Sequence, residues 1–214
     1  MLTAAGIHAG YRRGTPVLTG IDLTVESGTI VGLAGPSGCG KSTLARVLAL
    51  LQRPWFGRVE IDGVPAGGVR YRATRAQRTA IGVVFQQPRQ ATDPRLTLRE
   101  LIAEPRLAGG RPADPDRETA LHALVGLTPD LLGRRPHEVS DGQLQRACLA
   151  RAVSLRPRYL ICDEMTAMLD AATTAALAAT ITTLARDGTG VLAISHDEEL
   201  LHAWADRIER PWHP

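Results

Sequence analysis

The sequence predicts an α/β fold with a mainly parallel sheet, and two segments carry this prediction. An apolar run over residues 29–34 leads through a glycine-rich loop into the helical pattern 44–51, and a second apolar run, 159–162, ends in two carboxylates. Short, continuous apolar runs are typical of parallel strands that are buried on both faces. The length of 214 residues suits one globular domain, so we expect a single domain over 1–214.

Composition excludes several classes of protein. Hydrophobic residues make up 44% and charged residues 22% of the chain, which argues against a disordered or fibrous protein. Apolar runs such as 44–51 are much shorter than the roughly 20 residues that a membrane-spanning helix needs. Residues 1–10 lack a basic stretch followed by an apolar core, so no signal peptide is indicated and we expect a cytoplasmic protein.

Arginine dominates the basic residues, because lysine occurs only at Lys41. The densest arginine cluster, for which we expect a solvated helix face, is Arg70, Arg72, Arg75 and Arg78. The formal net charge is only +3 and no nucleic-acid-binding module is present in the sequence. We therefore expect no nucleic-acid partner.

The cysteines, Cys39, Cys148 and Cys162, are odd in number and far apart in the sequence. Their spacing fits neither a disulfide framework nor a zinc or iron–sulfur site. We therefore expect free thiols and no transition metal held by this chain.

The loop between the first apolar run and the helical pattern predicts a phosphate-binding site. Its residues are Gly35, Pro36, Ser37, Gly38, Cys39, Gly40, Lys41, Ser42 and Thr43. Glycines let the backbone turn its N–H groups toward phosphate oxygens, and the helix N-terminus adds partial positive charge. Lys41 is expected to reach the terminal phosphates and Ser42 to offer a hydroxyl to Mg²⁺. The loop indicates a P-loop NTPase core, but kinases, GTPases, helicases and transport ATPases all share it.

Two acids follow the second apolar run. Asp163 and Glu164 are expected at the carboxyl edge of the sheet, where nucleotides bind. Asp163 can hold Mg²⁺ through a water molecule, and Glu164 can orient or deprotonate an attacking water. The alternative is a strand that ends in an ordinary acidic turn, and the phosphate loop favours the catalytic interpretation.

A third motif, residues 139–146, has the sequence Val-Ser-Asp-Gly-Gln-Leu-Gln-Arg. Ser140 with Gln143 three positions later forms a capping-box pattern ahead of the helical stretch 144–153, which offers a second helix N-terminus to a phosphate. The motif resembles the LSGGQ signature of the ATP-binding cassette (ABC) family. That resemblance implies an ATPase in which two chains sandwich two ATP molecules head to tail, with Ser140 and Gly142 contacting the γ-phosphate held by the other chain.

Other residues match landmarks of the ABC family in the expected order. Gln86 resembles the glutamine of the Q-loop, and His196 resembles the switch histidine. Residues 167–170, which end in Asp170, resemble the D-loop, and Tyr11 stands where the family has an aromatic that stacks on adenine.

The resemblance also implies chemical roles, with ATP and Mg²⁺ as cofactors. Glu164 would be the general base, Gln86 would sense Mg²⁺ and water, and His196 would hold the γ-phosphate. Ser42, Gln86 and Asp163 would be the Mg²⁺ ligands, Asp163 through water.

One signature position departs from the family, because Asp141 stands where the first signature glycine is expected. A carboxylate at about 6 Å from the nucleotide would oppose its charge by roughly 3 kcal/mol, whereas an outward side chain would be screened to far less. The hypothesis is that Asp141 weakens the site that this chain completes on its partner.

The layout of the ABC family predicts the organisation of the chain. Residues 1–30 and 55–85 would form an antiparallel β-subdomain, supported by the turn signals 62–63 and 67–68. A proline-rich helical subdomain that carries the signature would occupy 88–156. The helix 171–186 would end before Gly188, a residue suited to a helix C-cap.

The segments 84–88, 93–98 and 164–170 resemble the peptide, nickel and metal-opine importers of the family. The resemblance implies an ATPase subunit on the inner face of the cell membrane that powers import. Its partners would be a second ATPase chain, identical or different, permease subunits and an external substrate-binding protein.

Two other functions stay open at this point. The first is an ATP-binding regulatory partner with weakened catalysis, which Asp141 suggests; Glu164 and His196 argue against a full loss of hydrolysis. The second is a soluble cassette that acts on DNA or ribosomes, which would predict a long coiled coil or a second cassette, and neither is visible in the sequence.

Overall fold

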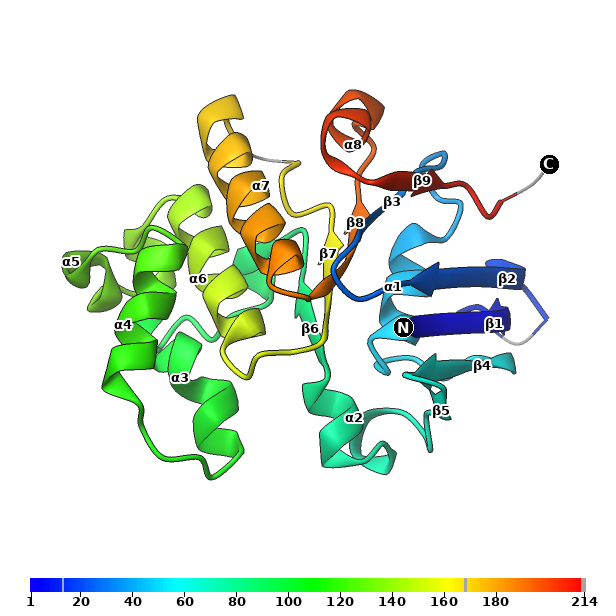
Figure 1. Ribbon diagram of the computed structural model, residues 1–214, viewed down its shortest axis with the longest axis horizontal. Coiled ribbons are helices and arrows are strands. Elements are labelled where there is room, and N and C mark those ends of the chain that lie inside the picture. Colours follow the sequence, from blue (N-terminus) through cyan, green and yellow to red (C-terminus); the bar gives the residue numbers. More distant parts are fainter. Residues whose placement is uncertain (13, 168, 213–214) are drawn as a thin grey trace.

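Two sheets and their covering helices make up the protein (Figure 1). The computed structural model describes residues 1–12, 14–167 and 169–212. Within these residues, a parallel sheet has the strand order β6-β7-β8-β3-β9, and an antiparallel sheet has the order β2-β1-β4-β5. The predicted α/β class with a mainly parallel sheet is therefore confirmed.

The strands are β1 (Leu2–Ala9), β2 (Leu18–Val25), β3 (Ile30–Leu33), β4 (Phe56–Ile61), β5 (Val64–Pro65), β6 (Ile81–Val84), β7 (Tyr159–Asp163), β8 (Gly190–Ile194) and β9 (Arg207–Glu209). The α-helices are α1 (Lys41–Leu48), α2 (Arg75–Thr79), α3 (Leu98–Ala108), α4 (Pro115–Leu124), α5 (Pro129–Leu132), α6 (Asp141–Val153), α7 (Ala171–Arg186) and α8 (Glu198–Trp204). Short 3₁₀ helices are η1 (Arg70–Arg72), η2 (Pro88–Gln90) and η3 (Pro136–Glu138).

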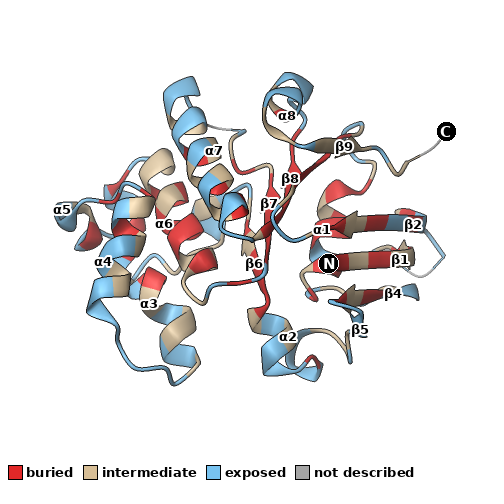
Figure 2. Ribbon diagram, viewed as in Figure 1, coloured by how far each residue is buried: buried red, intermediate tan, exposed pale blue. Residues whose placement is uncertain are grey.

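The central strands β3, β7 and β8 of the parallel sheet are buried along their whole length, which explains their mostly apolar residues (Figure 2). Along β7, Leu160 and Cys162 join a core with α6, α7 and α8, whereas Tyr159 and Ile161 join a core with α1 and the antiparallel sheet. Helix α1 thus lies between the two sheets, and the loop that precedes it sits at the carboxyl edge of β3.

The antiparallel sheet is smaller than predicted. Asp62 and Gly63 form the expected turn, with positive φ angles of 51° and 77°, between β4 and β5. The sheet ends at Pro65, and the strand β6 inside the predicted range 55–85 pairs instead in parallel with β7. The run Ile-Gly-Val-Val of β6 does not alternate polar and apolar residues, as a half-exposed antiparallel strand would.

The segment 88–156 contains η2, α3, α4, α5, η3 and α6, with no strand among these residues. Pro88, Pro115, Pro129 and Pro136 each stand at the first position of a helix, where the missing N–H costs nothing. Helix α7 has the predicted bounds, and Gly188, with φ of 100°, follows its C-cap.

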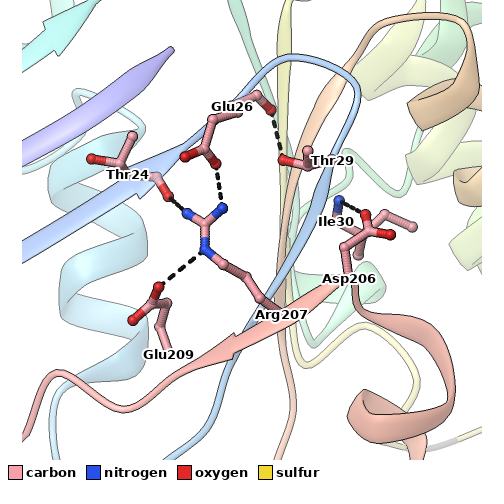
Figure 3. A network of polar contacts seen from close by, with 7 residues as sticks. All are labelled: Thr24, Glu26, Thr29, Ile30, Asp206, Arg207 and Glu209. Atoms are coloured by element: carbon pink, nitrogen blue, oxygen red, sulfur yellow. Dashed lines mark hydrogen bonds and ion pairs between the residues drawn. The ribbon is translucent and has the colours of Figure 1, made fainter.

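The strand β9 is anchored beside β3, which leads into the phosphate loop (Figure 3). Arg207 donates hydrogen bonds to the Glu26 carboxylate, the Thr24 carbonyl and, at 3.0 Å, the Glu209 carboxylate. The Asp206 carboxylate accepts a hydrogen bond at 2.7 Å from the N–H of the first β3 residue. These contacts hold β9 against β3, the strand that positions the site, and against the end of β2.

Candidate functional site

The phosphate loop joins β3 to α1 and depends on glycine at particular positions. Gly38 and Gly40 have φ angles of 79° and 109°, which side chains of L-residues rarely adopt. A Cβ atom at Gly40 would lie 2.6 Å from Leu18 Cδ2 and 2.9 Å from Val17 Cγ1, whereas nothing lies within 4 Å of one at Gly38. Both positions need glycine for the backbone, and Gly40 also needs it for packing.

Lys41 lies inside the phosphate loop rather than in solvent. Its side chain is buried, and its ammonium donates hydrogen bonds to the carbonyls of Gly35 at 2.6 Å and Pro36 at 3.0 Å. It is the first residue of α1, whose first turn contains no acidic residue. Ammonium charge and helix N-terminus therefore favour an anion at the same place.

Ser42 and Asp163 form the pair that can hold a divalent cation. The Ser42 hydroxyl donates to Asp163 Oδ1 at 3.0 Å, across the space between α1 and the end of β7. Burial raises the pKa of Asp163, with the neighbouring charge of Glu164 adding to the rise, while the Ser42 hydrogen bond opposes it. A divalent cation would offset the charge of this buried carboxylate, and hard oxygen donors suit Mg²⁺, so these residues fit that ion.

Three side chains from distant parts of the sequence meet directly beside this pair. Gln86 Nε2 donates to Glu164 Oε2 at 3.0 Å, and His196 Nδ1 lies 3.7 Å from the same oxygen. Gln86 follows β6, Glu164 follows β7 and His196 follows β8, so the sheet brings all three to one edge. Glu164 also has a φ angle of 49°, an uncommon backbone conformation that often marks a functional position.

Tyr11 lies against the start of α1. Its hydroxyl is 3.0 Å from Thr43 Oγ1 and accepts a hydrogen bond from Arg46 at 2.9 Å. Tyr11 is 65% exposed as a residue, and it lines a cavity of about 760 Å³ together with Arg46 and Tyr71. This placement suits stacking on a base whose phosphates occupy the neighbouring loop.

The signature segment begins α6, as the capping pattern predicts. Ser140 Oγ accepts from the Gln143 N–H at 3.2 Å, and the Gln143 side chain accepts from the Ser140 N–H at 3.0 Å. The carboxylate of Asp141 lies 2.8 Å from Arg89 Nε. A Cβ atom at Gly142 would come within 2.9 Å of Thr173 Cγ2, so glycine lets α6 approach Thr173 of α7 without a shift of that side chain.

The signature and the phosphate loop are not brought together within one chain. Among the described residues, no hydrogen bond or ion pair joins Ser140–Gln143 to Gly35–Thr43. Asp170 caps α7, accepting from the N–H of Thr173 at 2.9 Å and from its hydroxyl at 2.7 Å, and these bonds lower the pKa of Asp170. Met168, inside the predicted D-loop, lies outside the described residues.

The sequence did not predict three polar side chains that hold the Gln86 segment, residues 85–91, in place. Arg89, Gln145 and Arg151 each donate to backbone carbonyls across the gap between this segment and α6. No sequence pattern marks them, because their acceptors are main-chain atoms far away in the sequence. The buried position of Gln145, at 1% exposure, is visible only in the fold.

Membrane-spanning helices and metal-binding clusters are both absent from the described ranges 1–12, 14–167 and 169–212. No helix there has both the length and the apolar character to cross a lipid bilayer. No group of three or more His, Cys, Asp or Glu side chains gathers there as a metal-binding cluster. Cys39, Cys148 and Cys162 are all free thiols.

Comparisons with known proteins show the family of the chain. The model of the ABC transporter family matches residues 18–167. The chain is 37% identical over 209 residues to the nickel import ATP-binding proteins NikE of Shigella dysenteriae serotype 1 and Escherichia coli K12, covering 96% of this chain and 78% of each relative.

Solved structures give the same result. The dimeric ABC transporter cassette MJ0796 superposes with a TM-score of 0.89 at 27% identity, covering 99% of this chain and 94% of that one. Its post-hydrolysis state, bound to ADP and Pi, superposes with a TM-score of 0.88 at the same identity. With a family match over most of its length and a site that fits ATP and Mg²⁺, the chain belongs to the ABC transporter family and is an ATP-hydrolysing cassette.

Proposed function

We propose that this chain hydrolyses ATP between its own phosphate loop and the signature of a second cassette chain, and thereby powers nickel import. The observation that carries the proposal is the meeting of Gln86, Glu164 and His196 beside the Ser42–Asp163 pair. An acid, an amide and an imidazole at the mouth of a phosphate loop can orient and deprotonate a water that attacks a terminal phosphate.

Each residue has a role that follows from its position. An incoming phosphate competes with the Gly35 and Pro36 carbonyls for the Lys41 ammonium, which then binds the terminal phosphates. Ser42 and Asp163 would hold Mg²⁺, and bound Mg²⁺ neutralises charge on the phosphate oxygens.

Gln86, Glu164 and His196 act on the attacking water and on the terminal phosphate. Glu164 accepts its proton, and Gln86, already bonded to Glu164, orients it. His196, 3.7 Å from the Glu164 carboxylate, holds the terminal phosphate. Closure of the second chain excludes bulk water, which strengthens these interactions.

The signature supports the choice of a second cassette as partner. Ser140 begins α6 and is exposed, and its segment makes no polar contact with the phosphate loop of its own chain in the described part of the structure. An exposed helix N-terminus that lies apart from the phosphate loop of its own chain is suited to an ATP phosphate held by a partner. A second copy of this chain is the simplest such partner, arranged head to tail.

Transmembrane permease subunits would be the remaining direct partners, with this chain bound to them on the inner face of the cell membrane. A cavity of about 650 Å³ opens between the Gln86 segment and the helices α3 and α6. Its lining includes Gln90, Pro105, Arg151 and Leu155. Its mixed apolar and basic lining suits a short helix from a permease, and its continuity with Gln86 would couple ATP to transport. An external substrate-binding protein would deliver the cargo, for which the 37% identity to NikE favours nickel.

Hydrolysis of Mg–ATP by Glu164→Gln tests the catalytic part of the proposal. Loss of a positioned base should reduce turnover about a hundredfold or more. Glu199→Gln, an equal change at an exposed acid on α8, should leave turnover unchanged. Native turnover in Glu164→Gln would contradict the proposal.

Nickel uptake tests the cargo. Cells that lack this chain should accumulate less Ni²⁺ than cells that carry it, and a Glu164→Gln chain should not restore the uptake. Intact Ni²⁺ uptake with impaired peptide uptake would assign a peptide cargo instead.

A further inference from the structure

Arg89 contacts residues that come directly before and directly after Ser140 in the sequence. It lies in η2, three residues after Gln86, and its guanidinium reaches three points of the segment 136–141. Nη1 donates to the Pro136 carbonyl at 2.6 Å, Nη2 donates to the Val139 carbonyl at 3.0 Å, and Nε lies 2.8 Å from Asp141 Oδ1. Two guanidinium nitrogens thus donate hydrogen bonds and the third forms an ion pair, so this planar group fixes orientation in a way that a lysine ammonium does not.

Two further side chains hold the segment 85–91 on α6. Gln145 Nε2 donates to the Phe85 carbonyl at 3.0 Å, and Arg151 Nη1 donates to the Ala91 carbonyl at 2.8 Å. The residues on either side of Gln86 are thus fixed to the helix that the signature begins. Arg89 contacts the start of the signature from outside it, whereas Gln145 lies within the motif and Arg151 lies further along α6.

The ion pair with Arg89 determines how the negative charge of Asp141 acts on a bound nucleotide. Both side chains of the pair are about half exposed, at 47% for Arg89 and 45% for Asp141, so the ion pair alone adds little stability. Its effect is geometric: the carboxylate is held against a cation of its own chain, and the guanidinium offsets its charge. An Asp141 held in this way does not present a free negative charge to a nucleotide.

We propose that Arg89 is a positioning residue, and that its contact with Asp141 joins the Gln86 segment and the signature into one unit. Because Gln86 bonds to Glu164 at 3.0 Å, ATP bound to one chain then influences where that chain places Ser140 on the ATP of its partner. This inference rests on the proposed function, in which the signature acts on the second chain. Asp141 supports turnover under this proposal, which replaces the hypothesis that it weakens the site.

A double-mutant cycle tests the coupling. Arg89→Met, Asp141→Asn and the double variant are compared with the native chain for kcat and KM with Mg–ATP. Asp93 and Arg95, which follow Arg89 in the sequence, form another surface ion pair at 2.6 Å. Asp93→Asn, Arg95→Met and their double variant therefore make a matched control.

We expect each of Arg89→Met and Asp141→Asn to lower kcat about threefold or more, with KM for ATP little changed. The double variant should be no slower than Arg89→Met alone, and the control variants should match the native chain. Unchanged or faster turnover in Asp141→Asn, or effects of the two changes that simply multiply, would overturn the proposal.

Hydrogen exchange gives a readout that does not depend on turnover. Amides of residues 136–143 should exchange faster in both Arg89→Met and Asp141→Asn than in the native chain, while those of α7 should not. Unchanged exchange at 136–143 would overturn the proposal. Failure of the proposed function is distinguishable, because it appears in the native chain as turnover that does not depend on Glu164.

Discussion

Replacement of Gly40 by alanine should destabilise the protein strongly, even before ATP is considered. The φ angle of 109° costs an L-residue about 1–2 kcal/mol. The new Cβ would lie 2.6 Å from Leu18 Cδ2 and 2.9 Å from Val17 Cγ1, and overpacking of this kind adds about 1–3 kcal/mol. We therefore expect Gly40→Ala to lose about 2–5 kcal/mol of the free energy of unfolding.

Gly38→Ala is the matched control for this prediction. Its φ angle is 79°, but nothing lies within 4 Å of the added Cβ, so only the conformational cost of about 1–2 kcal/mol applies. Urea denaturation without nucleotide, followed by circular dichroism, measures both values if the dependence on denaturant stays unchanged. Equal losses in the two variants would refute the packing argument for Gly40.

The remaining predictions concern the thiols and the anchor of β9. Burial raises the pKa of Cys148 to about 11 and raises that of Cys162 further. A thiol reagent at neutral pH should therefore label Cys39, and Mg–ATP should slow that labelling. Equal labelling of all three cysteines, measured by mass spectrometry, would contradict this prediction. Arg207→Met should destabilise the protein by about 1–3 kcal/mol in urea denaturation at neutral pH. The Arg207 hydrogen bond lowers the pKa of Glu26 in the folded state, so its stabilisation is present above the ordinary value of 4.5 and is lost as the pH falls below it. The gap between native and Arg207→Met chains should therefore narrow in acid, and a constant gap would count against the role of Glu26.

Motifs built from neighbouring residues were predictable from the sequence. The phosphate loop and the capping box of Ser140 with Gln143 depend on local backbone geometry, so their residues can be recognised without the fold. The first turn of α1 is also informative. It begins at Lys41, earlier than the apolar pattern at 44–51 indicates, because polar residues of the loop supply its first turn.

Contacts between distant segments were not predictable. Gln86 and Glu164 are 78 positions apart, and their hydrogen bond depends on β6 and β7 being neighbours in the parallel sheet. The family layout placed β6 in the antiparallel region, because a short apolar strand carries no sign of its partner. The contact of Arg89 with Asp141 likewise depends on how η2 packs on α6, so the sequence left the effect of Asp141 open.

Complementation between two inactive variants tests whether two copies of this chain share their ATP sites. Glu164→Gln removes the base but keeps an intact signature, whereas Ser140→Arg blocks the signature but keeps Glu164. Each variant alone should be inactive. A mixed dimer holds one intact site, so an equal mixture should recover up to roughly a quarter of the native rate. If both variants fold and bind ATP but their mixture stays inactive, two copies of this chain do not share their ATP sites, which would contradict the proposed head-to-tail dimer.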